Sequence, residues 1–271
     1  MKNLKPTKED RFLFYKNIVN ETKNPRQKEL NKIEKDIKQR FKEYKNRFNK
    51  NDVCSLKEDG AITVKNKEHL KKLYTSRKSK IGELKKELTT NEKGKVDNIC
   101  QFCTFETVSS LDHFLPKSTF EEYSVNPLNL FPICSTCNTK KSDNLKNESG
   151  ECLFLNLYTD ILPKEQYLFV NLEIDKNEDF VPNFYLKNID NKIDDKLFKK
   201  IENHYKELKL ITRFKESVGY VMDEFENSKK ITGLSEEVFI EEAEKQINSE
   251  IYNINNFKVV LEKELLNNLK K

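Results

Sequence analysis

The sequence lacks long apolar stretches. No run of 18 apolar residues occurs anywhere in its 271 residues, so no membrane-spanning helix and no membrane partner are expected. The first residues, Met1 to Pro6, contain no apolar core of the kind that a secretion signal needs. No internal repeat is visible either, so a repeat array is not predicted. A cytoplasmic protein is therefore expected.

Acidic residues are scarce in the first third of the chain. Residues 1–90 contain 26 Lys and Arg but only 13 Asp and Glu, whereas residues 91–271 contain 24 and 32. A basic lobe of this kind suits a polyanionic partner such as DNA. Two other origins remain open, because charged helix faces are often only solvated and abundant Lys, Asn and Ile can reflect an AT-rich genome. Genome composition does not explain why the two parts differ in charge.

Cysteine is sparse, but four of the six cysteines form two Cys-x-x-Cys pairs. Because thiols stay reduced in the cytoplasm, these residues are better explained as metal ligands than as disulfides. The pairs Cys100–Cys103 and Cys134–Cys137 can supply four thiolates to one tetrahedral ion and leave no open position, which predicts a structural Zn²⁺. A redox role for the pairs is the alternative. Cys54 and Cys152 are then expected to be spare thiols.

A recognisable set of polar residues lies between and after these pairs. The first segment is Asp112-His113-x-x-Pro116-Lys117-Ser118, and the second is Asn129-Leu130-x-Pro132-x-Cys134-x-x-Cys137-Asn138-x-x-Lys141. Over residues 96–145 this order resembles the HNH endonucleases, and among them the zinc-stapled branch that includes recombination endonuclease VII. The last letter of the family motif is often His; here it is Asn138, which that branch also uses. The resemblance implies a ββα-metal unit.

The motif residues have the chemistry that hydrolysis of a phosphodiester needs. His113 is the candidate general base, because a neutral imidazole can take a proton from water near pH 7. Asp112 and Asn138 offer oxygen ligands that suit one catalytic Mg²⁺ or Mn²⁺ ion. The resemblance implies that Asn129 bridges the loop and holds the base in register; an ordinary turn asparagine is the alternative. Adjacent strand residues point to opposite faces, so Asp112 and His113 can serve one site only if the strand ends or bulges there.

Other polar residues have weaker signals. Three lysines beside the motifs are candidate contacts to DNA phosphates, namely Lys117, Lys140 and Lys141, although lysines are most often simply solvated. His69 and His204 lie in helical stretches without ligand partners at useful spacing, so both are expected to be structural or surface residues.

Apolar periodicity outlines the rest of the chain. A capping box at Thr7–Asp10 predicts a first helix through about Val19. Helical spacing predicts further helices near residues 26–50, 70–88, 193–211 and 235–265, and a short helix from about residue 137. Short apolar runs predict strands near 108–112, 128–132, 154–158, 167–174 and 180–186. We therefore predict an α+β protein, mainly α-helical, with a central zinc-bound ββα-metal unit and a few short strands after it. The expected domains are a basic helical lobe (1–95), the HNH unit (96–150) and a region of strands followed by helices (151–271).

The resemblance makes a metal-dependent HNH endonuclease acting on DNA the leading hypothesis, with 5′-phosphate and 3′-hydroxyl ends as products. The alternative is a non-catalytic zinc-ribbon subunit that binds nucleic acid; such ribbons share the four cysteines but have no use for Asp112-His113 beside Asn138. Compact bacterial HNH proteins with helical lobes often act in phage defence beside an ATPase, and this analogy gives an ATPase as a candidate partner. Cutting both strands needs two sites and hence a homo-oligomer.

Overall fold

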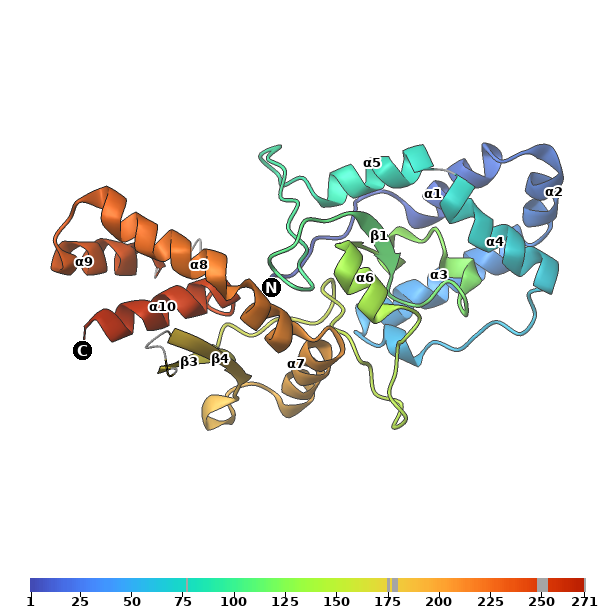
Figure 1. Ribbon diagram of the computed structural model, residues 1–271. Coiled ribbons are helices and arrows are strands. Elements are labelled where there is room, and N and C mark those ends of the chain that lie inside the picture. The colour runs from blue at the N-terminus through green and yellow to red at the C-terminus, as the bar shows by residue number, and fades with distance from the viewer. Residues whose placement is uncertain (77, 175, 177–179, 248–252, 271) are drawn as a thin grey trace. The chain divides into compact units, whose positions relative to one another are not determined.

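The computed structural model describes residues 1–271 except 77, 175, 177–179, 248–252 and 271. It divides into two compact units, Asn3–Ile161 and Leu162–Lys271, and Met1–Lys2 belongs to the latter. The fold class is α+β and mainly helical, as predicted (Figure 1). In the described part of the chain, no helix has the length and apolar character needed to cross a membrane. The predicted zinc unit, residues 96–150, lies within the first compact unit.

The N-terminal half of the first unit is helical. Its helices are α1 (Arg11–Asn20), α2 (Asn24–Lys32), α3 (Glu34–Asn49), α4 (Val64–Ser76) and α5 (Lys78–Leu88), with a 3₁₀ turn, η1 (Val53–Ser55), between α3 and α4. The predicted helix over 26–50 is two helices, because the chain leaves helical geometry at Ile33, where φ is −103° and ψ is 11°. The predicted helix over 70–88 also divides, and Arg77 between its two parts lies outside the described residues.

An aromatic cluster forms the core against α3. Ile37, Phe41, Tyr44 and Phe48 recur at helical spacing, and all four are buried. The ring of Tyr44 meets that of Tyr123 with centroids 4.9 Å apart, in an edge-on arrangement. Since Tyr123 ends the 3₁₀ turn η2 (Glu121–Tyr123), α3 packs against the segment that leads to Ser124.

The ββα order predicted for the cysteine-rich segment is present. β1 (Ser110–His113) pairs antiparallel with β2 (Leu130–Ile133), with His113 opposite Leu130. The 3₁₀ turn η3 (Pro127–Asn129) leads into β2, and α6 (Ser135–Lys141) follows it. This helix begins earlier than predicted because Cys134 caps it, its sulfur accepting a hydrogen bond from the Cys137 amide at 3.4 Å.

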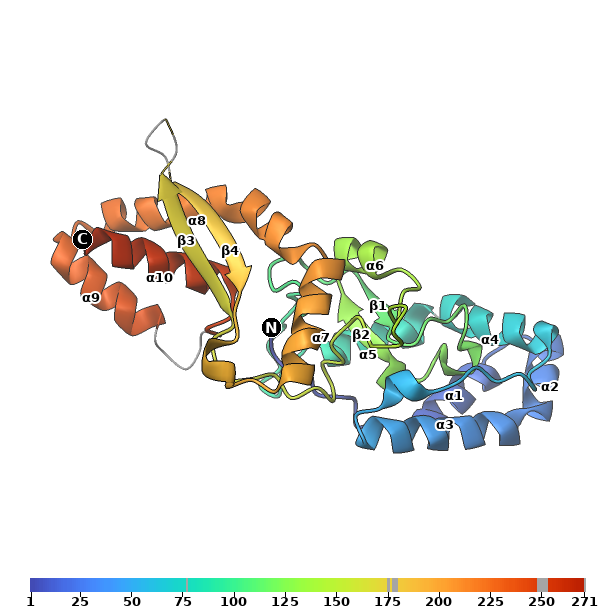
Figure 2. The same ribbon diagram turned by 90° about the horizontal axis from the view of Figure 1, so that it is seen from below.

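The second unit is a hairpin packed on helices. β3 (Leu168–Ile174) and β4 (Phe180–Leu186) pair antiparallel along their whole length, which confirms the two predicted strands. The helices are α7 (Asp195–Glu207), α8 (Leu210–Thr232), α9 (Glu236–Ile247) and α10 (Phe257–Leu269). Figure 2 shows the hairpin beside α8 and α10, which it contacts. The predicted helix over 235–265 is thus two helices, and α10 starts at a new cap, Asn256, whose side chain accepts from the Lys258 amide.

Residues 154–158 do not form the predicted strand. Leu155 and Leu157 are buried, as they would be in a strand. However, the Asn156 side chain accepts a hydrogen bond from the Tyr158 amide, and its backbone carbonyl accepts from the amides of Thr159 and Asp160. Asparagine-centred turns of this kind compete with strand ladders, and here the turn prevails.

Cys54 and Cys152 form a disulfide, so the expectation of two spare thiols is wrong. Their Cα atoms lie 6.2 Å apart, a separation that a disulfide can span. The bridge joins η1 to the segment that follows the ββα unit, across a sequence separation of 98 residues. It therefore fastens the helical lobe to the far end of the cysteine-rich segment.

Candidate functional site

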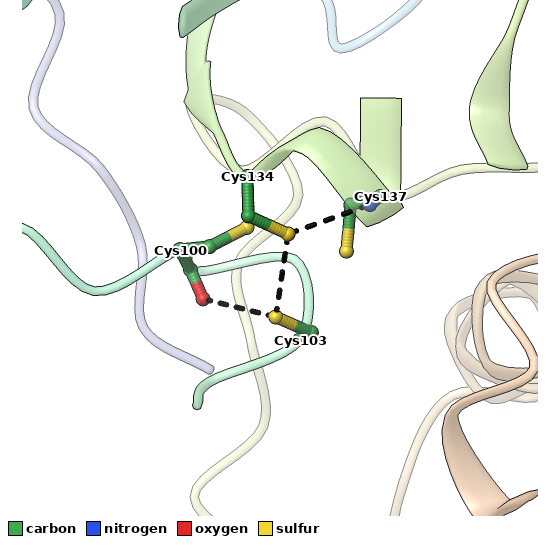
Figure 3. Close-up of side chains that lie close together, drawn as sticks. All are labelled: Cys100, Cys103, Cys134 and Cys137. Carbon is green, nitrogen blue, oxygen red and sulfur yellow. Dashed lines mark hydrogen bonds between the residues drawn. The ribbon is translucent and has the colours of Figure 1, made fainter. Parts of the chain in front are cut away.

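Four cysteine side chains gather at one buried point of the first unit (Figure 3). The ligand atoms of Cys100, Cys103, Cys134 and Cys137 all lie within 4.8 Å of one another. The sulfurs of Cys103 and Cys134 are 3.8 Å apart. A tetrahedral zinc ion with Zn–S bonds of about 2.3 Å separates its sulfurs by about 3.8 Å. The cluster can therefore hold a structural metal ion such as zinc, with every ligand supplied by the protein.

Each cysteine pair presents two sulfurs through tight local geometry. After the first pair, Thr104 has a φ of 72°, and its amide donates to the Cys100 carbonyl at 2.7 Å, so the chain folds back on itself. In the second pair, Cys134 caps α6 and Cys137 lies in its first turn. A metal ion in this cluster would tie the loop before β1 to the helix after β2.

His113 ends β1 in a buried position with a defined orientation. Its Nε2 lies 2.8 Å from the backbone carbonyl of Ser124. Because a carbonyl oxygen only accepts hydrogen bonds, Nε2 must carry the hydrogen, and the neutral ring then has its lone pair on Nδ1. The ring of Tyr74, on α4, meets the imidazole edge-on with centroids 4.6 Å apart. Burial, reinforced by the charges of Lys117 and Lys141, lowers the pKa of His113 to about 3, although the bond to Ser124 raises it. His113 is therefore neutral near pH 7.

Asp112 and His113 alternate in burial along β1, and the strand ends at His113. His113 is buried and Asp112 is half-buried. Lys141, on α6, places its ammonium 3.1 Å from Asp112 Oδ2 and donates to the His113 carbonyl at 2.7 Å. Asn138 lies one helical turn before Lys141 on α6 and is half-buried.

Lys141 is itself inside the protein. Its side chain is only 2 % exposed, and its ammonium lies over the ring of Phe154 at 5.7 Å from the centroid. The predicted contact between Lys141 and a DNA phosphate has no support in this geometry, because its charge is directed at Asp112. Lys117 and Lys140 are half-exposed, and Lys117 lies 5.0 Å from the centre of the Tyr74 ring, close to His113.

Asn129 bridges the loop that follows β1. Its Oδ1 accepts from the Leu115 amide at 2.8 Å, and its Nδ2 donates to the carbonyls of Leu115 and Tyr123 at 3.0 and 3.3 Å. The Tyr44 hydroxyl, from α3, donates to the same Oδ1 at 3.2 Å. Asn129 is fully buried. These contacts hold both ends of the loop between His113 and Ser124, the residue that receives the imidazole hydrogen bond.

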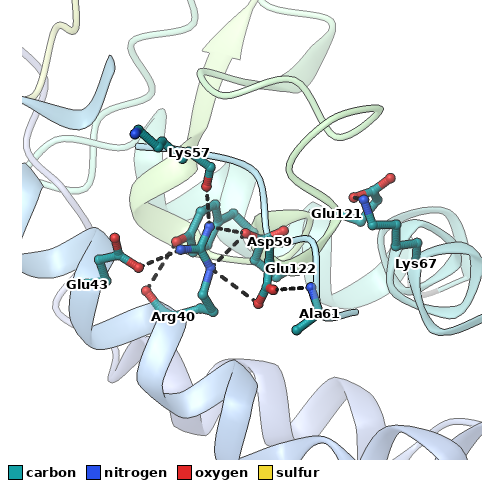
Figure 4. Close-up of polar contacts among 9 residues, drawn as sticks. Arg40, Glu43, Lys57, Asp59, Ala61, Lys67, Glu121 and Glu122 are labelled. Atoms are coloured by element: carbon teal, nitrogen blue, oxygen red, sulfur yellow. Dashed lines mark hydrogen bonds and ion pairs between the residues drawn. The ribbon is translucent and has the colours of Figure 1, made fainter. Parts of the chain in front are cut away.

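An ion-pair network that sequence reasoning missed includes Glu122, two residues before Ser124 in the chain (Figure 4). Arg40, on α3, donates to Glu122 at 2.6 and 3.0 Å and to the Lys57 carbonyl at 2.6 Å. It also pairs with Glu43 and lies over the Tyr123 ring. The available signal was the acidic pair Glu121-Glu122 directly between two aromatic residues, Phe120 and Tyr123. A buried carboxylate there requires a cation from elsewhere.

Comparisons with known proteins give one partial similarity. No protein-family model matches the chain, and no solved structure matches it. A segment of 75 residues is 32% identical to a protein of Escherichia phage lambda named "Protein ea31". The similarity covers 27% of this chain and spans only 25% of the length of that phage protein.

Proposed function

We propose that this protein is a metal-dependent HNH endonuclease that hydrolyses phosphodiester bonds of DNA. One observation carries the proposal: Nε2 of His113 is bound to the Ser124 carbonyl at 2.8 Å, which leaves the lone pair on Nδ1 to accept a proton from water. Burial and the bond to Ser124 give the ring one orientation and one tautomer. The cysteine cluster joins the segment before β1 to the helix after β2, and the contacts of Asn129 hold the loop that follows His113. Both support this arrangement.

Asp112 and Asn138 would hold the catalytic Mg²⁺ or Mn²⁺ ion. Asp112 Oδ2 is buried and makes no hydrogen bond, since the ammonium of Lys141 is close to it but not aligned for one. A carboxylate oxygen without a hydrogen bond, together with an amide oxygen, suits a cation that keeps several of its waters. When bound, such an ion supplies charge that stabilises the phosphate oxygens and the leaving oxygen.

One observation favours the alternative of a non-catalytic zinc module. The Lys141 ammonium already lies where it neutralises Asp112, as in a purely structural ion pair. In that case Asp112 would have no need of a divalent cation, and the protein would bind nucleic acid without cutting it. The two functions differ in what His113 does, because a structural module does not need a free imidazole nitrogen.

Cleavage of plasmid DNA tests the proposal. Supercoiled plasmid is incubated with the full chain and Mg²⁺ or Mn²⁺, with and without EDTA, and the ends of the products are analysed. We expect EDTA-sensitive cleavage that leaves 5′-phosphates, and a loss of at least about 100-fold in rate for His113→Ala, because general bases contribute about 10² to 10⁴ in rate. The zinc content of the variant should be unchanged.

Glu148→Gln is the control, since Glu148 is an exposed carboxylate outside the site. This substitution should leave cleavage unchanged. If the wild type binds DNA but cuts none under any divalent cation, the zinc-module alternative holds. If His113→Ala cuts as fast as the wild type, His113 is not the base.

Two further parts of the proposal concern assembly. An ATPase partner and a role in phage defence extend it by analogy with compact HNH proteins that have helical lobes. A second copy of the chain is needed if both strands are cut, since the described part of one chain contains one candidate base of this geometry. If cleavage requires ATP only when a second protein is purified with this chain, that protein is the ATPase partner. Linear plasmid in excess of nicked plasmid would show that both strands are cut and that a second copy takes part.

A further inference from the structure

A basic cavity lies in the helical part of the first unit, and it contains none of the site residues discussed above. It has a volume of about 750 Å³. It is bordered by α2 and α4, which contact each other and lie side by side (Figure 1). The charged and titratable side chains that line it are Lys23, Arg26, Lys28, Glu29, Lys65 and His69. This volume is within the range of about 300 to 1,000 Å³ that is typical of small-molecule sites.

The lining carries an excess of positive charge that the protein does not neutralise. Its one carboxylate, Glu29, is already bound by Lys32 at 3.0 Å and lies 3.8 Å from Lys65. Lys23, Arg26 and Lys28 have no acidic side chain within ion-pair distance in the described part of the chain. Like charges gathered around one hollow repel one another, so the arrangement is stabilised by an anion.

His69 adds an unsatisfied polar atom to this lining. Its Nδ1 is buried and has no hydrogen-bond partner. Burial lowers the pKa of His69, and the charges of Arg26, Lys65 and Lys72 lower it further. A buried ring nitrogen without a hydrogen-bond partner is costly, so the polar groups of this lining are not fully satisfied by the protein itself.

We propose that this cavity binds the phosphate group of a nucleotide or of a nucleic acid. A phosphate offers several acceptor oxygens and negative charge, which the guanidinium of Arg26 and the ammonium of Lys65 can bind together. The cavity also has room for the sugar or base attached to that phosphate. The lining further includes the start of α2, where the helix dipole favours negative charge. This binding does not depend on cleavage by His113.

The experiment measures binding of the full chain to three probes in EDTA, so that nothing is cut. The probes are a fluorescent oligonucleotide with a 5′-phosphate, the same oligonucleotide with a 5′-hydroxyl, and adenosine monophosphate as a competitor. We expect Arg26→Ala and Lys65→Ala each to weaken binding of at least one probe by about tenfold, because a hydrogen bond to a charged group contributes about 1.5 to 3 kcal/mol. Arg26→Lys should recover part of the loss.

Lys35→Ala is the matched control, because it removes one charge from the same lobe at an exposed position of α3 outside the cavity. Displacement of the oligonucleotide by the mononucleotide from the wild type, but not from Arg26→Ala, identifies a free nucleotide as the ligand. Binding of oligonucleotides alone identifies the nucleic-acid backbone or its end. Equal losses for Arg26→Ala and Lys35→Ala, in variants that melt like the wild type, would overturn the proposal.

Discussion

Arg40 and Glu122 form an ion pair across 82 positions of sequence, with Arg40 Nη2 2.6 Å and Nε 3.0 Å from the same carboxylate oxygen. The side chain of Glu122 is 1% exposed and that of Arg40 is 13% exposed. Two residues after Glu122, the Ser124 carbonyl receives the hydrogen bond from His113. The backbone that orients the candidate base is therefore anchored through a buried carboxylate to α3.

We predict that Arg40→Ala lowers the free energy of unfolding by about 3 kcal/mol, because it leaves Glu122 charged and unpaired inside the protein. Denaturation in urea measures the change. Glu43→Ala removes the half-exposed partner of the same guanidinium and should cost less than about 1 kcal/mol. A double variant, Arg40→Ala with Glu122→Gln, should recover part of the loss.

The effect of Arg40→Ala should depend on pH in a defined direction. Burial raises the pKa of Glu122 from 4.5, and Arg40 opposes this rise, so its removal raises the pKa further. When the pKa of a carboxyl group is higher in the folded than in the unfolded state, the group lowers the free energy of unfolding at pH values above the pKa of the unfolded state. In that pH range the unfolded chain ionises more readily than the folded one. The deficit should therefore be larger at pH 7.5 than at pH 5. An equal deficit at both values would show that the charge of Glu122 is not its cause.

Asn129→Ala should destabilise the fold by about 2 to 4 kcal/mol. The change leaves the amide and carbonyl of Leu115 without their partner and removes an acceptor of the Tyr44 hydroxyl, all in a buried place. Asn129→Asp keeps the acceptor but places a carboxylate oxygen against the carbonyls of Leu115 and Tyr123 in a buried place, so its loss should be at least as large. Thermal and urea unfolding measure both variants, and a change below about 0.5 kcal/mol for Asn129→Ala would show that water or a neighbour replaces the amide.

Metal removal should unfold the ββα segment. We expect one zinc ion per chain by elemental analysis, loss of that ion in Cys103→Ser and Cys137→Ser, and a lower melting temperature in the presence of a strong chelator, because closed four-thiolate sites contribute directly to folding. Cys54→Ser is the control, since it changes a cysteine outside the cluster and should leave the zinc content intact. Full zinc retention in Cys137→Ser would contradict the assignment.

The contribution of the Cys54–Cys152 disulfide to stability should depend on redox conditions. Cys152→Ser should lower the unfolding free energy by about 2 to 4 kcal/mol under oxidising conditions, because the bridge restricts an unfolded loop that spans a sequence separation of 98 residues. Under reducing conditions the wild type should lose the same stability, and the two proteins should then unfold alike. A difference that persists in reductant would assign the effect to packing of the sulfur.

The spacing of cysteines along the chain was enough to predict the cysteine cluster. Two Cys-x-x-Cys pairs around a hairpin can meet in few ways, and the structure brings all four sulfurs together. The strand predicted over 108–112 is β1, but it begins at Ser110 and extends one residue further, to His113. The role of each residue in catalysis stays a prediction, since spacing defines neighbours and not chemistry.

Local side-chain hydrogen bonds and contacts between distant residues explain what the sequence could not reveal. Residues 154–158 have the apolar run of a strand, but the hydrogen bonds of Asn156 form a turn that such a run does not disclose. The partnership of Arg40 with Glu122, like the bridge between Cys54 and Cys152, joins distant positions that no local pattern connects. Lys141 was a candidate phosphate contact because of its position in the motif, whereas its ammonium lies inside the protein beside the half-buried Asp112.

Lys141 and a divalent cation would compete for Asp112, and this competition gives the last prediction. If Asp112 is a cation ligand, Lys141→Met removes a positive charge 3.1 Å from its oxygen while keeping the apolar stem, so Mn²⁺ should bind at least about tenfold more tightly. Binding is measured by the electron paramagnetic resonance signal of free Mn²⁺. Asp112→Asn in the same background should abolish the gain. If Asp112 is instead only the structural partner of Lys141, the single variant should lose stability without gaining Mn²⁺, which would favour the non-catalytic zinc module.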